Sequence, residues 1–246
     1  MQRLLIAGAG YLGMALAERL KGTHFELFLA RRSPQTIAGT KTICCDFTDA
    51  ATLQALPEVE AIYYAVAADD SSDEAYEKAY WLGVKNLVEH YKKRSIRPRF
   101  YLSSSTSAYA ATQGEIVTEE TTELSQKGSS RFIVKGERLL LDSGLDGAVL
   151  RYGGIYGPGR TSMIRRIRDR METLTPNAVQ YTNRIHCDDA AAIVAYVMEK
   201  SSGMEIFNAV DAQAIPRDDV IAWVAKELGM AIEDYPKDLS VRKSKP

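Results

Sequence analysis

The sequence predicts an α/β fold in which a parallel sheet of about seven strands carries helices on both faces. A short apolar run at residues 4–6 is followed by Gly8, Gly10 and Gly13 and then by a helix-periodic stretch, which is the order strand, tight turn, helix. Further short apolar runs then alternate with helical patterns along the chain. The length of 246 residues accommodates one such body with a modest appendage.

The composition argues against several kinds of partner. The 31 basic and 32 acidic residues leave a formal net charge of -1, so nothing in the charge favours nucleic acid or an anionic membrane. No apolar run approaches the ~20 residues of a membrane span, and the first apolar run is too short for a secretory signal. The three cysteines, Cys44, Cys45 and Cys187, lack metal-ligand spacing and are expected to be buried free thiols in a reducing cytoplasm. We therefore expect a cytoplasmic protein, without a bound metal, whose partner is a small-molecule substrate.

The glycine-rich turn predicts a dinucleotide site. In such a turn Gly8 permits the sharp change of direction, Gly10 lets the backbone approach a pyrophosphate, and Gly13 lets the helix pack on the strand. The helix begins at Tyr11 and Leu12, where free N–H groups and a partial positive charge would face the phosphates. An ordinary turn is the alternative, but the position between strand and helix favours cofactor binding.

The end of the second predicted strand, residues 26–29, indicates which dinucleotide is bound. An acidic residue usually follows this strand in proteins that prefer NAD, where it holds the ribose hydroxyls. Here the strand runs into Ala30, Arg31 and Arg32, and the two arginines could clamp a 2′-phosphate through charge-assisted hydrogen bonds. We therefore predict NADP(H) in preference to NAD(H). A solvated arginine pair is the alternative.

The next two predicted strands, residues 42–45 and 61–64, end in residues suited to a cofactor wall. Asp46 and Phe47 follow the first strand and are expected at the adenine. Because the carboxyl ends of parallel strands share one edge of a sheet, the residues after both strands should border one cleft. Small residues suited to lying under the cofactor follow the second strand: Ala65, Val66 and Ala67.

A serine-rich segment follows the fifth predicted strand, residues 99–102. Ser103 and Ser105 stand at the carboxyl end of this strand. Ser103 is expected to contact the cofactor, and the hydroxyl group of Ser105 could hold a substrate oxygen. A serine-rich turn without a catalytic role is the alternative.

The remaining predicted elements complete one interwoven structural unit. We expect a dinucleotide-binding domain at 1–151 and a small substrate-binding region at 152–246, with a disordered tail from residue 236. The other elements are helices at 76–91, 131–143 and 217–228 and strands at 148–150 and 205–207.

With these motifs in order, the chain resembles the extended short-chain dehydrogenase/reductases, the NAD(P)-dependent epimerase/dehydratase family. The resemblance implies a Rossmann domain, a bound nicotinamide dinucleotide, and a C-terminal region that recognises the substrate, commonly a nucleotide sugar. Family members are often dimers, which makes a homodimer an expectation here. The likeness covers almost the whole chain and rests on segments 8–13, 104–109, 150–151 with 156–159, 184–189 and 206–208.

The chain departs from the family pattern where the proton-transfer residues should be. Family members carry a tyrosine as general acid or base and, four residues later, a lysine that lowers its pKa. Alignment on Lys135 puts Arg131 at the tyrosine position, whereas alignment on Glu137 puts Ser129 and Ile133 at the two positions. This pattern resembles the atypical branch of the family, which lacks the active-site tyrosine.

Two smaller departures lie elsewhere. Ala7 occupies the position where family members usually carry an additional glycine, and Tyr80 occupies the position of the family's helix asparagine. The asparagine's part in the proton relay is therefore expected to be absent.

The resemblance nevertheless implies candidates for catalysis. Ser105 matches the family's catalytic serine or threonine, four residues before Tyr109. Tyr109 and Tyr152 are the nearest substitutes for the proton donor, and each would need a cation such as Lys135 or Arg151 to work near neutral pH. The resulting hypothesis is an NADP(H)-dependent oxidoreductase or epimerase acting on a carbonyl or nucleotide-sugar-like substrate. The alternative is a non-catalytic dinucleotide-binding sensor or partner-binding module.

Overall fold

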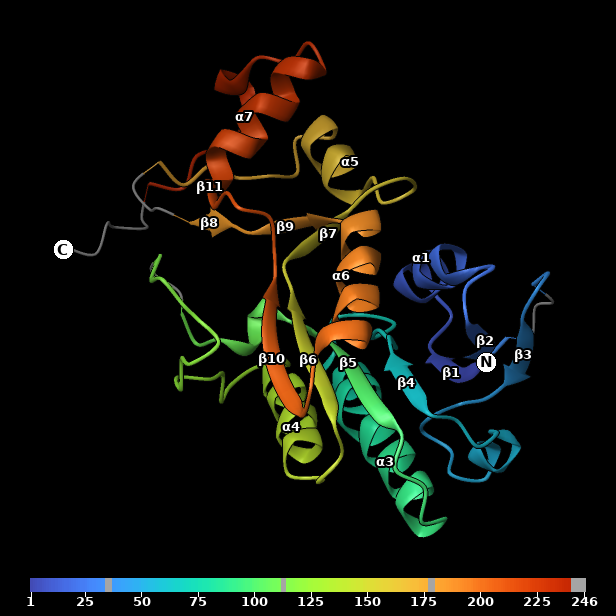
Figure 1. Cartoon of the computed structure of the whole chain (residues 1–246). Helices are drawn as coiled ribbons and strands as arrows, with labels where there is room; N and C mark the ends of the chain where they lie inside the picture. Colours follow the sequence, from blue (N-terminus) through green and yellow to red (C-terminus); the bar gives the residue numbers. More distant parts are fainter. Residues whose placement is uncertain (34–36, 112–113, 177–179, 240–246) are drawn as a thin grey trace.

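A seven-stranded parallel sheet forms the centre of the protein (Figure 1). The computed structural model describes residues 1–33, 37–111, 114–176 and 180–239. The strand order is β3-β2-β1-β4-β5-β6-β10, so the predicted parallel sheet of about seven strands is confirmed. The strands are β1 (Gln2–Ala7), β2 (Phe25–Arg31), β3 (Lys41–Cys44), β4 (Ala61–Tyr64), β5 (Arg99–Ser105), β6 (Gly147–Tyr152) and β10 (Met204–Ala209).

The inner strands are apolar on both faces because helices cover both sides of the sheet. Leu4 and Ile6 of β1 face one helical layer and Leu5 faces the other, and all three are fully buried. In the register, Leu5 lies between Phe28 of β2 and Ile62 of β4. Each such side chain contributes about 1.5–3 kcal/mol through its removal from water.

Two pairs of helices form the outer layers. Helices α1 (Tyr11–Leu20) and α6 (Cys187–Lys200) pack on one face, and α3 (Gly83–Lys93) and α4 (Ser130–Leu141) pack on the other. Strand β10 and helix α6 come from the C-terminal part of the chain but belong to the sheet and its layer. The two predicted parts of the chain are therefore joined through a common core.

The helix predicted at 76–91 is divided into three segments. It begins as α2 (Asp73–Tyr76), widens into a π-helical turn at Glu77–Leu82, and continues as α3. The wide turn lies against α4, where Gly136 has no side chain and a Cβ atom would overlap the backbone carbonyl of Tyr80. Hydrophobic periodicity alone does not distinguish a π turn from an α turn, so the sequence did not indicate it.

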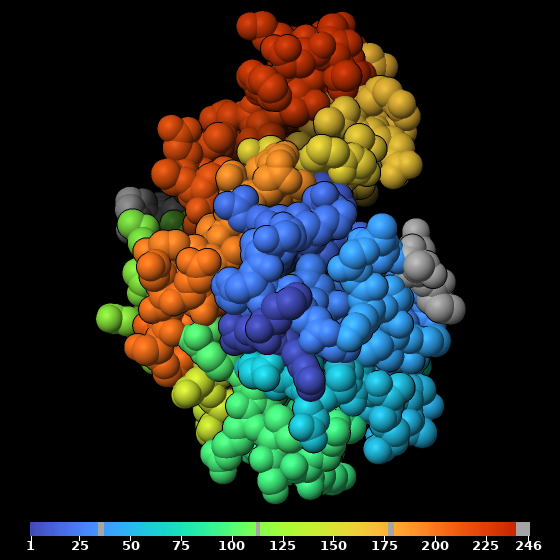
Figure 2. Space-filling model, turned by 45° about the vertical axis from the view of Figure 1, so that its right-hand side comes forward, coloured from blue at the N-terminus to red at the C-terminus, as the bar shows by residue number. Residues whose placement is uncertain are grey.

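The C-terminal region carries short elements that the sequence analysis missed. Figure 2 shows the yellow and red parts of this region together at one end of the molecule, whereas its orange part extends beside the blue N-terminal part. Its helices pack on a small separate core that includes Ile167, Ile221 and Val224. The missed elements are β7 (Gly154–Tyr156) with β9 (Arg184–His186), β8 (Tyr181–Thr182) with β11 (Ile215–Pro216), and α5 (Ser162–Arg168). The helix predicted at 217–228 is present as α7 (Arg217–Glu227). Single 3₁₀ turns occur at Thr52–Ala55, Thr106–Ala108 and Ile232–Asp234.

Part of the predicted disordered tail is ordered. The backbone N–H of Leu174 donates to Pro236 O, and Asp238 N–H donates to Leu174 O, both at 2.8 Å. These two hydrogen bonds hold the start of the tail on the C-terminal core, and residues 240–246 lie outside the described residues. Across the described ranges, no helix has the length and apolar character that crossing a membrane would require.

Candidate functional site

A cavity of about 830 Å³ opens at the carboxyl ends of the strands, where the strand order reverses between β1 and β4. Ligands of doubly wound sheets bind at this switch point. Every cofactor residue predicted from the sequence except Gly13 lines the cavity. Those residues are Gly8, Gly10, Tyr11, Leu12, Arg31, Arg32, Asp46, Phe47, Ala65, Val66, Ala67 and Ser103.

The glycine turn at the centre of the cavity has the geometry that a phosphate site needs. Gly8 has φ +93°, and a Cβ atom there would lie 2.6 Å from the backbone nitrogen of Val66. Gly13 lies behind the turn, where a Cβ atom would overlap the carbonyl oxygen of Gly8, which explains why it does not reach the cavity. Gly10, in contrast, faces open space, and a Cβ atom there would have no heavy atom of another residue within 4 Å, its two chain neighbours aside.

Helix α1 begins at this turn with its N–H groups available. Its N-cap residue is Gly10, which offers no side-chain cap, and its first turn holds no acidic residue. The first N–H groups of a helix have no partner within the helix and attract anions. The donor set therefore fits the pyrophosphate of a dinucleotide.

The two arginines line the cavity at the end of β2, which β1 and β4 separate from β5 and its serine segment. Arg32 forms a bidentate ion pair with Asp69, with Nη2–Oδ1 2.5 Å and Nη1–Oδ2 2.8 Å. Hydrogen bonding within the pair raises the pKa of Arg32 and lowers the pKa of Asp69. Both side chains are more than half exposed, and exposed ion pairs contribute only about 0–1 kcal/mol. A phosphate could therefore displace Asp69 at little cost.

The residues of the predicted adenine wall are held by neighbouring side chains. Phe47 is buried and packs edge-on against Tyr64, with ring centroids 5.7 Å apart. Asp46 Oδ1 accepts hydrogen bonds from the N–H of Thr48 at 2.9 Å and from its hydroxyl group at 2.7 Å. Burial tends to raise the pKa of Asp46, but these hydrogen bonds outweigh it, and the pKa is lowered. Asp46 is thus held as an anion in a defined orientation.

Ser105 is the predicted catalytic residue that the structure places in the cavity with a free proton. Its hydroxyl oxygen accepts from Ser107 N at 3.1 Å and from the Ser107 hydroxyl group at 3.0 Å. With its acceptor capacity used, the Ser105 O–H can donate to a ligand oxygen.

The hydroxyl groups of the two predicted tyrosines already form hydrogen bonds within the protein. Tyr152 lines the cavity, but it is fully buried, and its O–H donates to Ala190 O at 3.4 Å. Burial, with Tyr63 beside it, raises the pKa of Tyr152 well above its ordinary value. Tyr109 does not line the cavity, and its O–H donates to Asn208 Oδ1 at 2.7 Å. Neither phenol therefore offers a proton to the cleft.

The predicted cations also lie away from the cleft. Lys135 is exposed, with its ammonium group 5.1 Å from the ring centroid of Trp81, and does not line the cavity. Arg151 is buried in an ion pair with Glu137. On α4, Ile133 is the buried residue that packs against Ala108. The face of α4 toward the serine segment thus carries Ile133 and Glu137, whereas Lys135 lies against Trp81.

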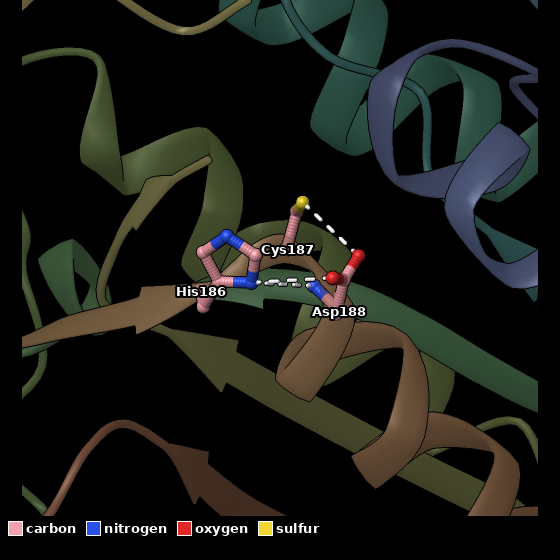
Figure 3. Close-up of side chains that lie close together, drawn as sticks. All are labelled: His186, Cys187 and Asp188. Atoms are coloured by element: carbon pink, nitrogen blue, oxygen red, sulfur yellow. Dashed lines mark hydrogen bonds and ion pairs between the residues drawn. The ribbon is translucent and has the colours of Figure 1, made fainter. Parts of the chain in front are cut away.

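His186, Cys187 and Asp188 lie together where α6 begins (Figure 3). The His186 Nδ1 accepts from the backbone N–H of Asp188 at 3.3 Å, so His186 caps the helix. Cys187 Sγ lies 3.5 Å from Asp188 Oδ1. Their metal-ligating atoms lie within 4.8 Å of one another, but the nitrogen and sulfur already have these partners, and the absence of a metal stays a prediction.

One cysteine prediction is wrong. Cys45 and Cys187 are buried free thiols, but Cys44 is exposed. Cys44 is the last residue of β3, which lies at the edge of the sheet, and its thiol group donates to Arg32 O at 3.2 Å.

Sequence reasoning did not place Tyr80, Lys78 and Arg160 in the site, yet all three line the cavity. Arg160 lies with its guanidinium carbon 5.2 Å from the ring centroid of Tyr11. Of these three residues, Tyr80 alone could have been noticed in the sequence as a site residue, because it stands where the family has an asparagine. No local sequence pattern indicates that the segments carrying Lys78 and Arg160 line the cavity.

The parallel sheet, the glycine turn at its switch point and the cavity that both border define a dinucleotide-binding protein of the Rossmann type. Residues 4–209 match the model of the NAD dependent epimerase/dehydratase family, and the chain belongs to this family. The resemblance inferred from the sequence is confirmed.

The similar proteins include both curated relatives and solved structures. Protein YeeZ of Escherichia coli (strain K12) is 26% identical over 262 residues, covering 100% of this chain and 90% of the relative. A 3-diazoavenalumate denitrifying reductase of Streptomyces sp is 29% identical over 254 residues, covering 92% and 82%. The structure of the UDP-Glc/GlcNAc 4-epimerase from Campylobacter jejuni superposes with a TM-score of 0.79 at 18% identity, covering 100% and 89%. This last likeness shows the fold.

Proposed function

We propose that the protein is an NADP(H)-dependent oxidoreductase or epimerase that acts on a carbonyl or nucleotide-sugar-like substrate. The observation that carries the proposal is one cavity that joins the glycine turn, the two arginines and Ser105. Membership of an NAD-dependent family and the likeness to a named reductase support enzymatic function.

Each part of the cavity has a role in this proposal. The glycine turn and the N-terminus of α1 would hold the pyrophosphate, and Arg31 with Arg32 would hold the 2′-phosphate. When bound, the cofactor supplies or accepts a hydride. Ser105 would orient the substrate oxygen, and the region 152–246 would supply most of the substrate contacts.

The proposal is tested first by binding and then by turnover. Titration with NADPH and NADH, followed by ligand fluorescence, should give a lower Kd for NADPH. Aldehydes, ketones and nucleotide sugars are then screened for oxidation of NADPH or for epimerisation. Normal NADPH binding without turnover of any of these compounds would count against an enzyme.

A specific observation favours the second candidate function, a non-catalytic dinucleotide-binding sensor or partner-binding module. Ile133 of α4 is buried among apolar residues, and Ser129, which immediately precedes α4, donates to Asp73 Oδ1 at 2.7 Å. These two residues cannot form the family's acid–base pair. Turnover that is lost in a Ser105→Ala variant with unchanged NADPH binding would eliminate this candidate.

A further inference from the structure

Four tyrosines line the cavity in the part of the chain that the structure describes: Tyr11, Tyr64, Tyr80 and Tyr152. Three of them already donate their hydroxyl protons to backbone carbonyl groups. Tyr64 donates at 2.6 Å, Tyr11 at 3.0 Å and Tyr152 at 3.4 Å. The O–H of Tyr80 donates to no acceptor among the described residues. Its proton is therefore available to a ligand.

Tyr80 is held in place by its surroundings. It belongs to the π-helical turn Glu77–Leu82, and π turns occur frequently at functional sites. It packs against the apolar cluster of Ala108, Ile133 and Val134, and the ring centroid of Tyr76 lies 5.1 Å away. Tyr80 thus joins the cavity to the cluster that contains Ile133, the residue at the family's lysine position when α4 is aligned on Glu137.

The environment of Tyr80 keeps its phenol neutral. Burial raises the pKa of Tyr80 above its ordinary value, and the nearby backbone N–H of Ala68 and the charge of Arg160 offset only part of this effect. Because Ile133 supplies no positive charge, the phenol is not prepared to act as a base at neutral pH. A neutral phenol whose proton has no acceptor among the described residues is suited to donate it to a ligand.

We propose that Tyr80 donates the proton to the substrate oxygen during carbonyl reduction, in place of the tyrosine that α4 lacks. This inference rests on the proposed function and names the acid of the same site. Hydride adds to the carbonyl carbon, the π electrons of the C=O bond move to oxygen, and this oxygen takes the phenol proton. The phenolate then regains a proton from water, and the cofactor is left oxidised.

The first test needs no substrate. Difluorotyrosine placed at position 80 gives one fluorine NMR signal, and its electron-withdrawing groups bring ionisation into a pH range that the fold tolerates. The signal is titrated in protein saturated with NADPH and in protein saturated with NADP⁺. These ligands differ by one positive charge on the nicotinamide ring. A charge within about 4–6 Å should make the pKa with NADP⁺ lower by about 1 or more.

Equal pKa values in the two complexes would overturn the assignment, because the phenol would then lie away from the nicotinamide. Failure of both cofactors to bind would instead contradict the proposed function, so the two failures are distinguishable.

The second test compares Tyr80→Phe with Tyr76→Phe on a carbonyl compound that the screen shows to be reduced. General acid catalysis contributes typically about 10²–10⁴-fold, so Tyr80→Phe should lower kcat by this order while the Kd for NADPH is unchanged. Tyr76 lies one helical turn before Tyr80 but does not line the cavity, and its variant should keep the wild-type rate. A wild-type kcat in Tyr80→Phe would refute the proposal.

Discussion

Arg151 of β6 and Glu137 of α4 form a bidentate ion pair inside the protein, with Nη2–Oε2 2.6 Å and Nε–Oε1 3.0 Å. Their side chains are 2% and 1% exposed. Ser104 donates its hydroxyl proton to the same carboxylate at 2.5 Å. Burial tends to lower the pKa of Arg151, but the Glu137 carboxylate outweighs it, and the pKa is raised. The pair joins the sheet to α4 directly behind the serine segment.

Removal of one partner of this pair should destabilise the fold strongly, because the other charge stays buried without compensation. We expect Glu137→Gln to lower the free energy of unfolding by about 3–5 kcal/mol. Urea denaturation followed by circular dichroism measures it. The exposed pair Arg168–Asp169 provides the control, and Arg168→Gln should leave the urea midpoint nearly unchanged. Similar losses of unfolding free energy in both variants would show that the burial of the ion pair does not determine the size of the loss.

Arg31 and Arg32 should determine cofactor preference. Each charge-assisted hydrogen bond to a phosphate contributes about 1.5–3 kcal/mol, so Arg31→Ala and Arg32→Ala should each raise the Kd for NADPH by about tenfold or more. The Kd for NADH should change little, and Arg19→Ala, at the far end of α1, should affect neither cofactor. Equal losses of NADPH and NADH affinity would defeat the NADP(H) preference.

Asp69 should weaken NADPH binding, since its carboxylate forms an ion pair with the Arg32 guanidinium group that would hold the 2′-phosphate. Asp69→Asn removes the competing charge and should lower the Kd for NADPH while leaving that for NADH unchanged. Fluorescence titration measures both constants. Weaker NADPH binding in this variant would show that Asp69 positions Arg32 for the ligand.

Gly8 and Gly10 should respond differently to the same substitution. Gly8→Ala places a side chain at φ +93° and 2.6 Å from Val66 N, so it should destabilise the fold by about 1 kcal/mol or more. Gly10→Ala enters open space and should leave the urea midpoint unchanged while weakening dinucleotide binding. A Gly10→Ala variant that binds NADPH normally would contradict the assigned pyrophosphate position.

Buried tyrosines should make the protein sensitive to alkali. Burial raises the pKa of Tyr63 from 10.0 to about 12. Above pH ~10 the unfolded chain loses this proton while the folded chain keeps it, so stability is complete below that pH and falls as the pH rises toward about 12. Urea midpoints measured across this range should fall less steeply in Tyr63→Phe. If the urea midpoints of wild type and Tyr63→Phe fell with the same slope against pH, the burial of Tyr63 would not be the cause of the alkali sensitivity.

The sheet could be predicted because most of its strands are short apolar runs beside helix-periodic stretches. The parallel pair β7–β9 and the antiparallel pair β8–β11 escaped prediction, because strands of two or three residues are too short to show a period. The catalytic candidates were harder to predict. Lys135 and Ile133 are two residues apart on α4 but lie on different faces, and the chain around the helix decides which face meets the cleft.

The sequence by itself determined the glycine turn, because the absence of a Cβ atom at Gly8 and the start of a helix at Tyr11 are local properties of the chain. Only the tertiary structure decided which charges and phenols are available in the cleft. Arg32 meets Asp69 across 37 residues, Tyr152 is committed to Ala190 across 38, and Tyr80 keeps its proton. Such pairings depend on how distant segments pack, and packing is a property of the assembled core.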